Sequence, residues 1–133
     1  MQVCQHNICD MERDMDLVRD LLLHIEGDPQ YDGQRWLRPE IPSEMGSPHH
    51  SIEEIAYHLN LLVEAGYLRG MTVLSGMPAI SRMTWQGHEF LDNIRDEDVW
   101  SKTKERIKGL SGIALGVVAQ IAEAEIKKRL GLS

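Results

Sequence analysis

Histidine and cysteine side chains are the first candidates for chemistry in this sequence, because both residue types bind transition metals. Cys4, His6 and Cys9 are close neighbours, but their spacing matches no standard zinc pattern and no second pair follows them. The pair 49–50 and His58 could gather around a metal ion, yet their spacing does not require it. We interpret these histidines as loop and helix residues, and we predict no metal site and no cofactor.

Carboxylates and nucleophiles are the next candidates, because general acid–base and covalent catalysis depend on them. His88 and Glu89 would begin a zinc-protease motif, but that motif needs a second histidine where this chain has Asp92. The acids at 53–54 and 96–98 stand at predicted helix starts, where the helix dipole accounts for them. The sequence contains no nucleophile elbow, P-loop or dinucleotide fingerprint. We therefore expect no enzymatic activity.

The distribution of charge limits where a polyanion could bind. The 133 residues carry a formal net charge of −7, which excludes a positive field over the whole molecule. Residues 1–66 hold 13 acids and 4 bases, whereas residues 67–85 hold two arginines and no acid. Residues 99–133 hold seven bases and three acids. The positive segments are thus 67–85 and the C-terminal tail.

Arginines around residues 67–85 are the candidates for contacting nucleic acid. Arg69 and Arg82 flank a predicted β-hairpin, and guanidinium groups suit phosphate recognition. Ordinary strand-surface arginines would show the same pattern, so this alternative stays open. Arg35 and Arg38 would extend the patch if residues 34–38 form a short edge strand that pairs with the hairpin.

The elements that must position these side chains follow from periodicity, and the length favours a soluble globular protein. Residues 11–27 have helical spacing and end at Gly27, which precedes an Asp-Pro pair. Residues 1–10 read as a flexible N-terminal extension, since Met11 could itself be a start. The predicted buried positions of this first helix are Met11, Met15, Leu17, Val18, Leu21, Leu22 and Ile25.

A second helix and a hairpin form the centre of the predicted fold. Ser51 and Glu54 make a capping box before a helix that Gly66 ends. Residues 67–74 and 80–84 read as two strands joined by a five-residue turn. Three helices then follow, beginning at Thr84, near residues 96–98, and at residue 110. The predicted apolar face of the second helix consists of Ile52, Ile55, Ala56, Leu59, Leu62 and Val63.

Two segments carry a resemblance to known proteins. Residues 55–68 (IAYHLNLLVEAGYL) resemble the recognition helix of bacterial winged-helix regulators, and residues 83–91 (MTWQGHEFL) are similar to the Leu-Thr-x-x-Gly-x-x-x-Leu pattern after the wing. Together with residues 11–19 and 99–100, they resemble domain-of-unknown-function family 2513 of bacteria and their prophages. The resemblance covers residues 11–133. It implies a winged-helix α+β fold, mainly α, but no function.

The presumed recognition helix departs from a DNA-binding one. It contains no lysine or arginine, and carboxylates on its solvent face would repel phosphates on both sides of a major groove. Only residues 42–51 are available for the helix that normally precedes it, and they include two prolines. An alternative function follows: a protein-interaction module that docks a basic partner through Glu53, Glu54, Tyr57, Asn60 and Glu64.

The last predicted helix, residues 110–130, is apolar on two faces, so it needs two partners. One face can cover its own domain, and the other could form a homodimer through Leu110, Ile113, Val117 and Ile121. Its uncharged stretch is too short to span a membrane. We expect a cytoplasmic protein with an extension at 1–10, a winged-helix domain at 11–95 and C-terminal helices at 96–133. Its role would be regulatory or accessory, of phage or prophage type.

Overall fold

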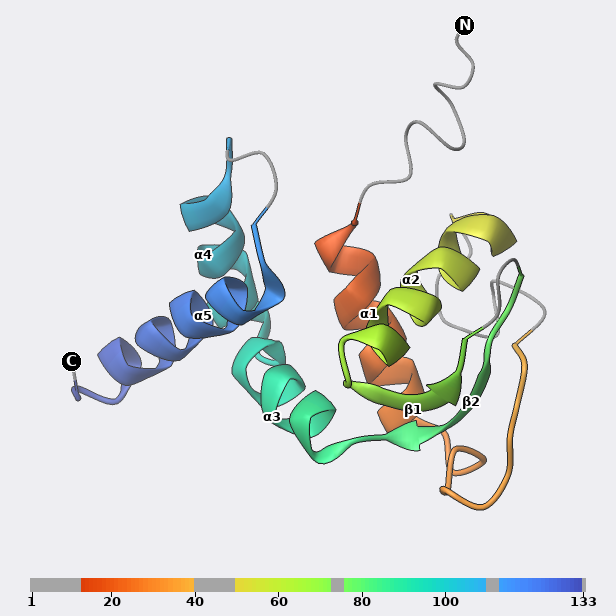
Figure 1. Cartoon of the computed structure of the whole chain (residues 1–133). Coiled ribbons are helices and arrows are strands. Elements are labelled where there is room, and N and C mark those ends of the chain that lie inside the picture. The colour runs from red at the N-terminus through yellow and green to blue at the C-terminus, as the bar shows by residue number, and fades with distance from the viewer. Residues whose placement is uncertain (1–12, 40–49, 73–75, 110–112, 133) are drawn as a thin grey trace, which may run out of the picture. The chain divides into compact units, whose positions relative to one another are not determined.

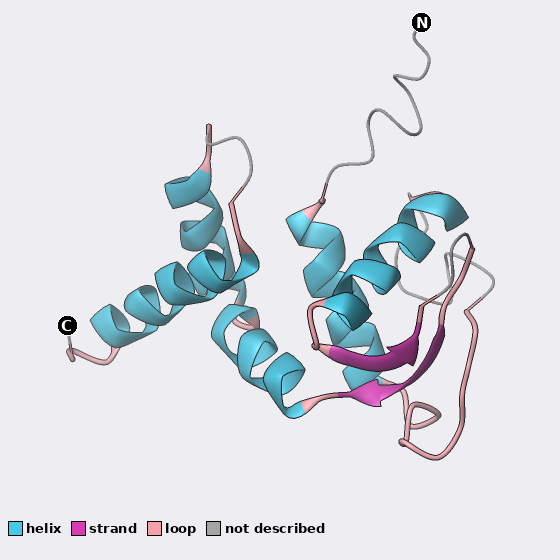
Figure 2. Ribbon diagram, viewed as in Figure 1, coloured by secondary structure: helices cyan, strands magenta, loops and turns pink. Residues whose placement is uncertain are grey.

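The fold is α+β and mainly helical, as expected. A computed structural model describes residues 13–39, 50–72, 76–109 and 113–132. Over these residues it has five helices and one two-stranded antiparallel hairpin (Figures 1 and 2). The chain divides into two compact units, residues 1–87 and 88–133. The domain boundaries predicted from the sequence stay a prediction.

Helix α1, Met15–Gly27, is the first element of the first unit. The Asp14 side chain caps it by accepting a hydrogen bond from the Leu17 amide, so the described helix starts later than residue 11. The helix ends at Gly27, as predicted. Its apolar stripe is confirmed at Leu17, Val18, Leu21, Leu22 and Ile25, which are buried, whereas Met15 is half-buried. Met11 lies outside the described residues.

Helix α2, Ile52–Glu64, begins with the predicted capping box: the Glu54 amide donates to Ser51 Oγ, and the Ser51 amide donates to Glu54 Oε1. Ile55, Ala56, Leu59 and Leu62 are buried, as the helical spacing indicates. The prediction was wrong for Ile52, which is 45% exposed. Ile52 lies in the first turn of the helix, where fewer side chains of the domain pack against it than against the residues that follow.

Strands β1 (Leu68–Met71) and β2 (Ala79–Met83) form the predicted hairpin, although residues 73–75 of its turn lie outside the described residues. Gly66 ends the preceding helix with φ of +86°, the left-handed conformation expected of it. Figure 1 shows the hairpin running alongside α1 and α2. Leu68, Ile80 and Met83 turn their side chains into the core between these elements.

Gly70 is needed for this packing. A Cβ atom at this position would lie 2.7 Å from the Ala79 carbonyl oxygen and 2.8 Å from a methyl group of Val63. The absence of a side chain therefore lets β1 approach both α2 and β2 closely.

The segment before α2 joins the hairpin by a single bridge. The Leu37 amide donates to the Ile80 carbonyl at 2.9 Å, and the Ile80 amide donates to the Leu37 carbonyl at 2.8 Å. The predicted strand 34–38 is thus a loop with one antiparallel bridge to β2, visible as the pink segment beside that strand in Figure 2. Pro39, two residues after Leu37, has no amide hydrogen to continue a ladder.

The remaining helices are α3 (Trp85–Ile94), α4 (Glu97–Ile107) and α5 (Leu115–Arg129). Thr84 starts α3 as expected, because its hydroxyl accepts a hydrogen bond from the Gly87 amide. Trp85, in the first turn of α3, is 75% exposed. In the second unit, α4 and α5 pack together, burying Val99, Trp100, Thr103, Val118 and Ala122.

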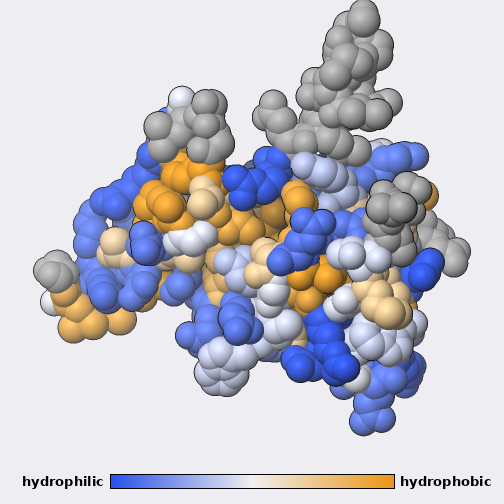
Figure 3. Space-filling model, viewed as in Figure 1, coloured by the Kyte–Doolittle hydropathy of each residue, from blue (hydrophilic) through white to orange (hydrophobic). Residues whose placement is uncertain are grey.

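Helix α5 starts later than predicted, since residues 113 and 114 precede it without helical structure. Within the described ranges, no helix is both long enough and apolar enough to cross a bilayer. Hydrophobic side chains lie at the C-terminal end of the chain in Figure 3, where Leu130 and Leu132 are exposed.

Candidate nucleic-acid interface

The two hairpin arginines face each other across the strands. Arg69 on β1 is the direct antiparallel partner of Arg82 on β2, and both side chains are exposed. Like charges placed directly opposite each other destabilise a sheet. Within the part of the chain that the structure describes, neither arginine forms an ion pair with a carboxylate.

An irregularity in the sheet aims Arg82 outward. The register pairs Arg69 with Arg82 but Gly70 with Ile80, so Ser81 is skipped. In a regular strand, residues two apart share a face, and Arg82 would then lie on the same side as the fully buried Ile80. The extra residue is a β-bulge, which lets Ile80 point into the core while Arg82 reaches solvent.

Neighbouring residues orient both guanidinium groups. Arg82 Nη1 donates to the Met83 carbonyl at 2.9 Å, and the aliphatic stem of Arg82 lies against the space above Gly33. Gly33 has φ of +88° and donates its amide to the Ser81 carbonyl. Arg69 lies over the ring of Trp36, with its guanidinium carbon 5.5 Å from the ring centroid.

Arg35 and Arg38 lie on the loop that bridges to β2, and both are exposed. Arg35 is 3.8 Å from an oxygen of Asp32, a carboxylate whose pKa is lowered by hydrogen bonds from the backbone amides of Gln34 and Arg35. Arg35 and Arg38 were expected to extend the patch if their segment pairs with the hairpin. The single bridge at Leu37 provides this pairing.

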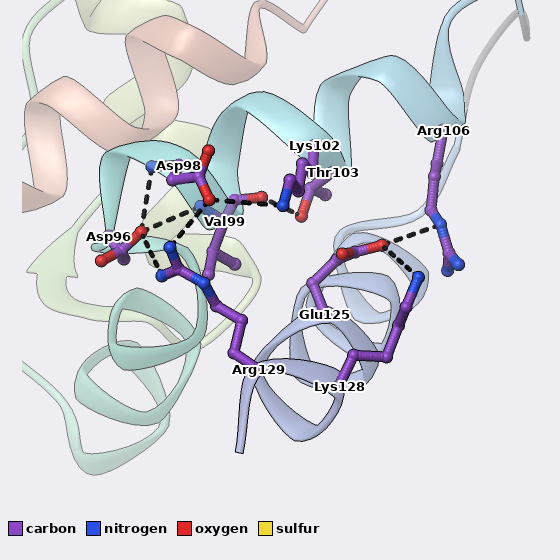
Figure 4. A network of polar contacts seen from close by, with 9 residues as sticks. All are labelled: Asp96, Asp98, Val99, Lys102, Thr103, Arg106, Glu125, Lys128 and Arg129. Atoms are coloured by element: carbon purple, nitrogen blue, oxygen red, sulfur yellow. Dashed lines mark hydrogen bonds and ion pairs between the residues drawn. The ribbon is translucent and has the colours of Figure 1, made fainter. Parts of the chain in front are cut away.

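The other positive segment of the sequence is neutralised inside the second unit (Figure 4). Arg129 of α5 contacts Asp96 at 3.2 Å and Asp98 at 2.8 Å, both at the start of α4. The hydrogen bond from the Val99 amide holds the pKa of Asp96 below its ordinary value, and the positive charge of Arg129 lowers it further. Arg106 and Lys128 both approach the buried carboxylate of Glu125, at 3.0 and 4.0 Å.

The proposed acidic docking face of α2 is smaller than its residue types indicate. The carboxylate of Glu54 is used in the capping box. The Asn60 amide donates to the Ala56 carbonyl and to the Gly76 carbonyl in the hairpin turn. Tyr57 is half-buried with its ring against His58. Glu53 and Glu64 remain exposed.

Two histidines of the sequence meet around Asp14, whereas His49 lies outside the described residues. His50 Nε2 is 3.1 Å from Asp14 Oδ2. The Asp14 amide donates to Nε2 of the buried His58, whose Nδ1 therefore carries the hydrogen and donates to the Glu54 carbonyl. Burial lowers the pKa of His58, although its contact with Glu54 and nearby carboxylates oppose that shift. This histidine joins α1 to α2 in its neutral form.

The residues considered for a dimer are partly covered in the single chain. Leu110 lies outside the described residues. Ile113 and Ile121 are half-buried, and Val117 is 41% exposed. The opposite stripe, with Val118 and Ala122, faces α4. The homodimer stays a prediction.

Trp36 was absent from the residues selected by sequence reasoning, although it stands between two of them. It is 45% exposed and contacts Arg69, which comes from an element 33 positions later in the chain. The signal available was its position inside Arg35-Trp36-Leu37-Arg38, a tryptophan among basic residues.

Comparison with known proteins identifies relatives without a described activity. A family model described as "Hypothetical protein (DUF2513)" matches residues 12–114. An uncharacterized protein of Haemophilus influenzae is 36% identical over 124 residues, which cover 90% of this chain and 99% of that protein. No solved structure matches the chain.

Proposed function

The chain belongs to the DUF2513 family of hypothetical proteins, and we propose that it is a non-catalytic winged-helix protein with a regulatory or accessory role that contacts DNA phosphates through its hairpin. Helix α1, the bridge at Leu37, helix α2 and the hairpin follow one another in the order typical of winged-helix domains. In this assignment α2 is the recognition-type helix and β1–β2 is the wing.

The observation that carries the proposal is the outward-facing pair Arg69 and Arg82. Two cations held opposite each other without a carboxylate repel, and an anion placed between them would reverse that cost. Phosphate is an anion whose oxygens match guanidinium donors. The bulge that turns Arg82 out of the core supports a role for this side chain in solvent rather than in folding.

The test is fluorescence anisotropy of labelled DNA at low and moderate salt. The wild type should bind at low salt, and its affinity should fall steeply as salt rises, because phosphate contacts release counterions. The double variant R69E/R82E should lose binding. The control K102E/K127E makes the same change of net charge at two exposed lysines of the second unit, and it should bind like the wild type.

Two results would reject this function. One is absence of DNA binding by the wild type at low salt. The other is equal weakening by both double variants, which would assign binding to overall charge rather than to the hairpin.

A second candidate is docking of a basic protein on α2. It is favoured by Glu53 and Glu64, which are exposed and form no ion pair among the described residues. If this face docks a partner, the charge-reversed variant E53K/E64K should lose proteins that the wild type captures. Recovery of the same partners by the variant would reject it.

A further inference from the structure

The Trp36 ring and the hairpin arginines form one surface, which we call the Trp36–arginine patch: Trp36, Arg69 and Arg82. From this patch we infer that the nucleic acid bound is single-stranded, with an unpaired base stacked on Trp36 and adjacent phosphates held by the two arginines. The inference rests on the proposed function and specifies the class of ligand.

The backbone holds Trp36 in place before any ligand arrives. Its neighbour Leu37 makes two hydrogen bonds to Ile80, at 2.9 and 2.8 Å, so the loop is fixed to β2 at this point. Arg69 lies over the ring and restricts it further. A stacking surface that is already ordered loses little conformational entropy on binding.

Exposure of the Trp36 ring leaves it accessible to a ligand. Trp36 is 45% exposed, although tryptophan gains considerable free energy from burial. Proteins that bind single strands place aromatic side chains beside positive charge, because each base has an apolar face and each nucleotide a phosphate. The patch combines these two features at a contact distance of 5.5 Å between guanidinium and ring centroid.

The acidic helix argues against a duplex as the preferred ligand. A duplex keeps its bases stacked on one another, so none is available to an exposed tryptophan unless the helix is opened. Reading a duplex through α2 would bring Glu53 and Glu64 to its phosphates, and this helix contains no cation in compensation. A single strand is flexible, so it can follow the patch without bringing its phosphates close to α2.

The experiment compares three labelled probes with the full chain at low salt: a thymidine 12-mer, a 12-base-pair duplex, and an abasic 12-mer with the same phosphates and no bases. The thymidine strand should bind more tightly than either of the others. W36A should weaken its binding by about 5- to 150-fold, the range for loss of one stacked base. The same variant should weaken binding of the abasic strand by a much smaller factor, because that strand has no base to stack on Trp36.

Trp85 provides the matched control. It is also an exposed tryptophan, at 75%, and among the described residues its ring forms no cation–π pair with either hairpin arginine. W85A should bind the thymidine strand like the wild type. Quenching of tryptophan fluorescence by that strand should persist in W85F and disappear in W36F, a readout that a change in folding alone would not produce.

The outcomes separate this inference from the function it rests on. If the duplex binds more tightly than the single strand and R69E/R82E abolishes binding, the inference is overturned and the proposed function stands. If W85A weakens binding as much as W36A does, or W36A has no effect, the Trp36–arginine patch is not the stacking site. If no probe binds, both proposals fail.

Discussion

The hairpin and the C-terminal helix pair are both basic in sequence, but they use their cations differently. On α4 and α5, Arg106, Lys128 and Arg129 lie within 4.0 Å of carboxylates on the same two helices or at the start of α4. On the hairpin, Arg69 lies opposite Arg82. A count of charge along the sequence treats the two regions alike. Among the described residues, Arg69 and Arg82 have no carboxylate partner, so the hairpin keeps two neighbouring cations for an external anion.

The difference also concerns burial. Glu125 is 5% exposed, so its charge must be compensated inside the second unit. The arginines of the hairpin are exposed and have no carboxylate partner among the described residues. Arg106, which pairs with Glu125, therefore contributes to folding, whereas the arginines on the hairpin are available for binding. The predictions below test this contrast, from the largest expected effect to the smallest.

Removal of Arg106 should have the largest effect. R106A leaves the buried Glu125 with Lys128 at 4.0 Å as its remaining cation, and we expect a loss of about 2 kcal/mol in the free energy of unfolding of the second unit. Urea denaturation measures it. R106K, which keeps a cation, should recover most of the loss, and R69A on the hairpin should change stability by less than about 0.5 kcal/mol. An unchanged unfolding midpoint for R106A would contradict the contrast.

Acid should destabilise the first unit before the second. The pKa of buried His58 is lower in the folded chain than its ordinary value of 6.5, so the unfolded chain takes up the proton first. Stability is therefore fully present above about pH 6.5 and falls as the pH decreases toward the folded pKa, by up to about 1.4 kcal/mol per pH unit. His50, Asp14 and Glu54 are the titratable groups that face this ring.

The measurement is urea unfolding at pH 7 and pH 5.5, followed by NMR signals of amides in α2 and α4. The α2 signals should report the larger loss, because Asp96 in the second unit keeps its charge to below its ordinary pKa. H58Q should flatten the pH dependence of the first unit. The same pH dependence in H58Q and wild type would assign it to another group.

Reversal of one hairpin charge should raise the stability of the chain slightly, whereas the two changes above lower it. R82E replaces two like charges with a cross-strand ion pair to Arg69, and we expect stability to rise by about 0.2–1 kcal/mol while nucleic-acid binding weakens. Thermal unfolding and anisotropy on the same sample measure both. R82Q should fall between wild type and R82E in each. A variant that loses stability and keeps its binding would show that Arg82 serves the fold.

Much of the fold could be predicted because local rules decide it. The capping box at Ser51, the stripe of α1 and the left-handed Gly66 depend on residues within one or two turns of each other. Ile52 was assigned by the same spacing and is exposed, since periodicity gives a face but not whether the domain covers it. The hairpin arginines were found from composition; their pairing was not.

The amino-acid sequence by itself determined the helices, the hairpin and the two positive segments, because each depends on neighbouring residues and on composition. Tertiary structure decided which cations are neutralised, since Arg129 meets Asp96 across 33 positions and Trp36 meets Arg69 across the same separation. It also decided the direction of Arg82, because a single skipped residue in the strand register reverses the face of every side chain beyond it.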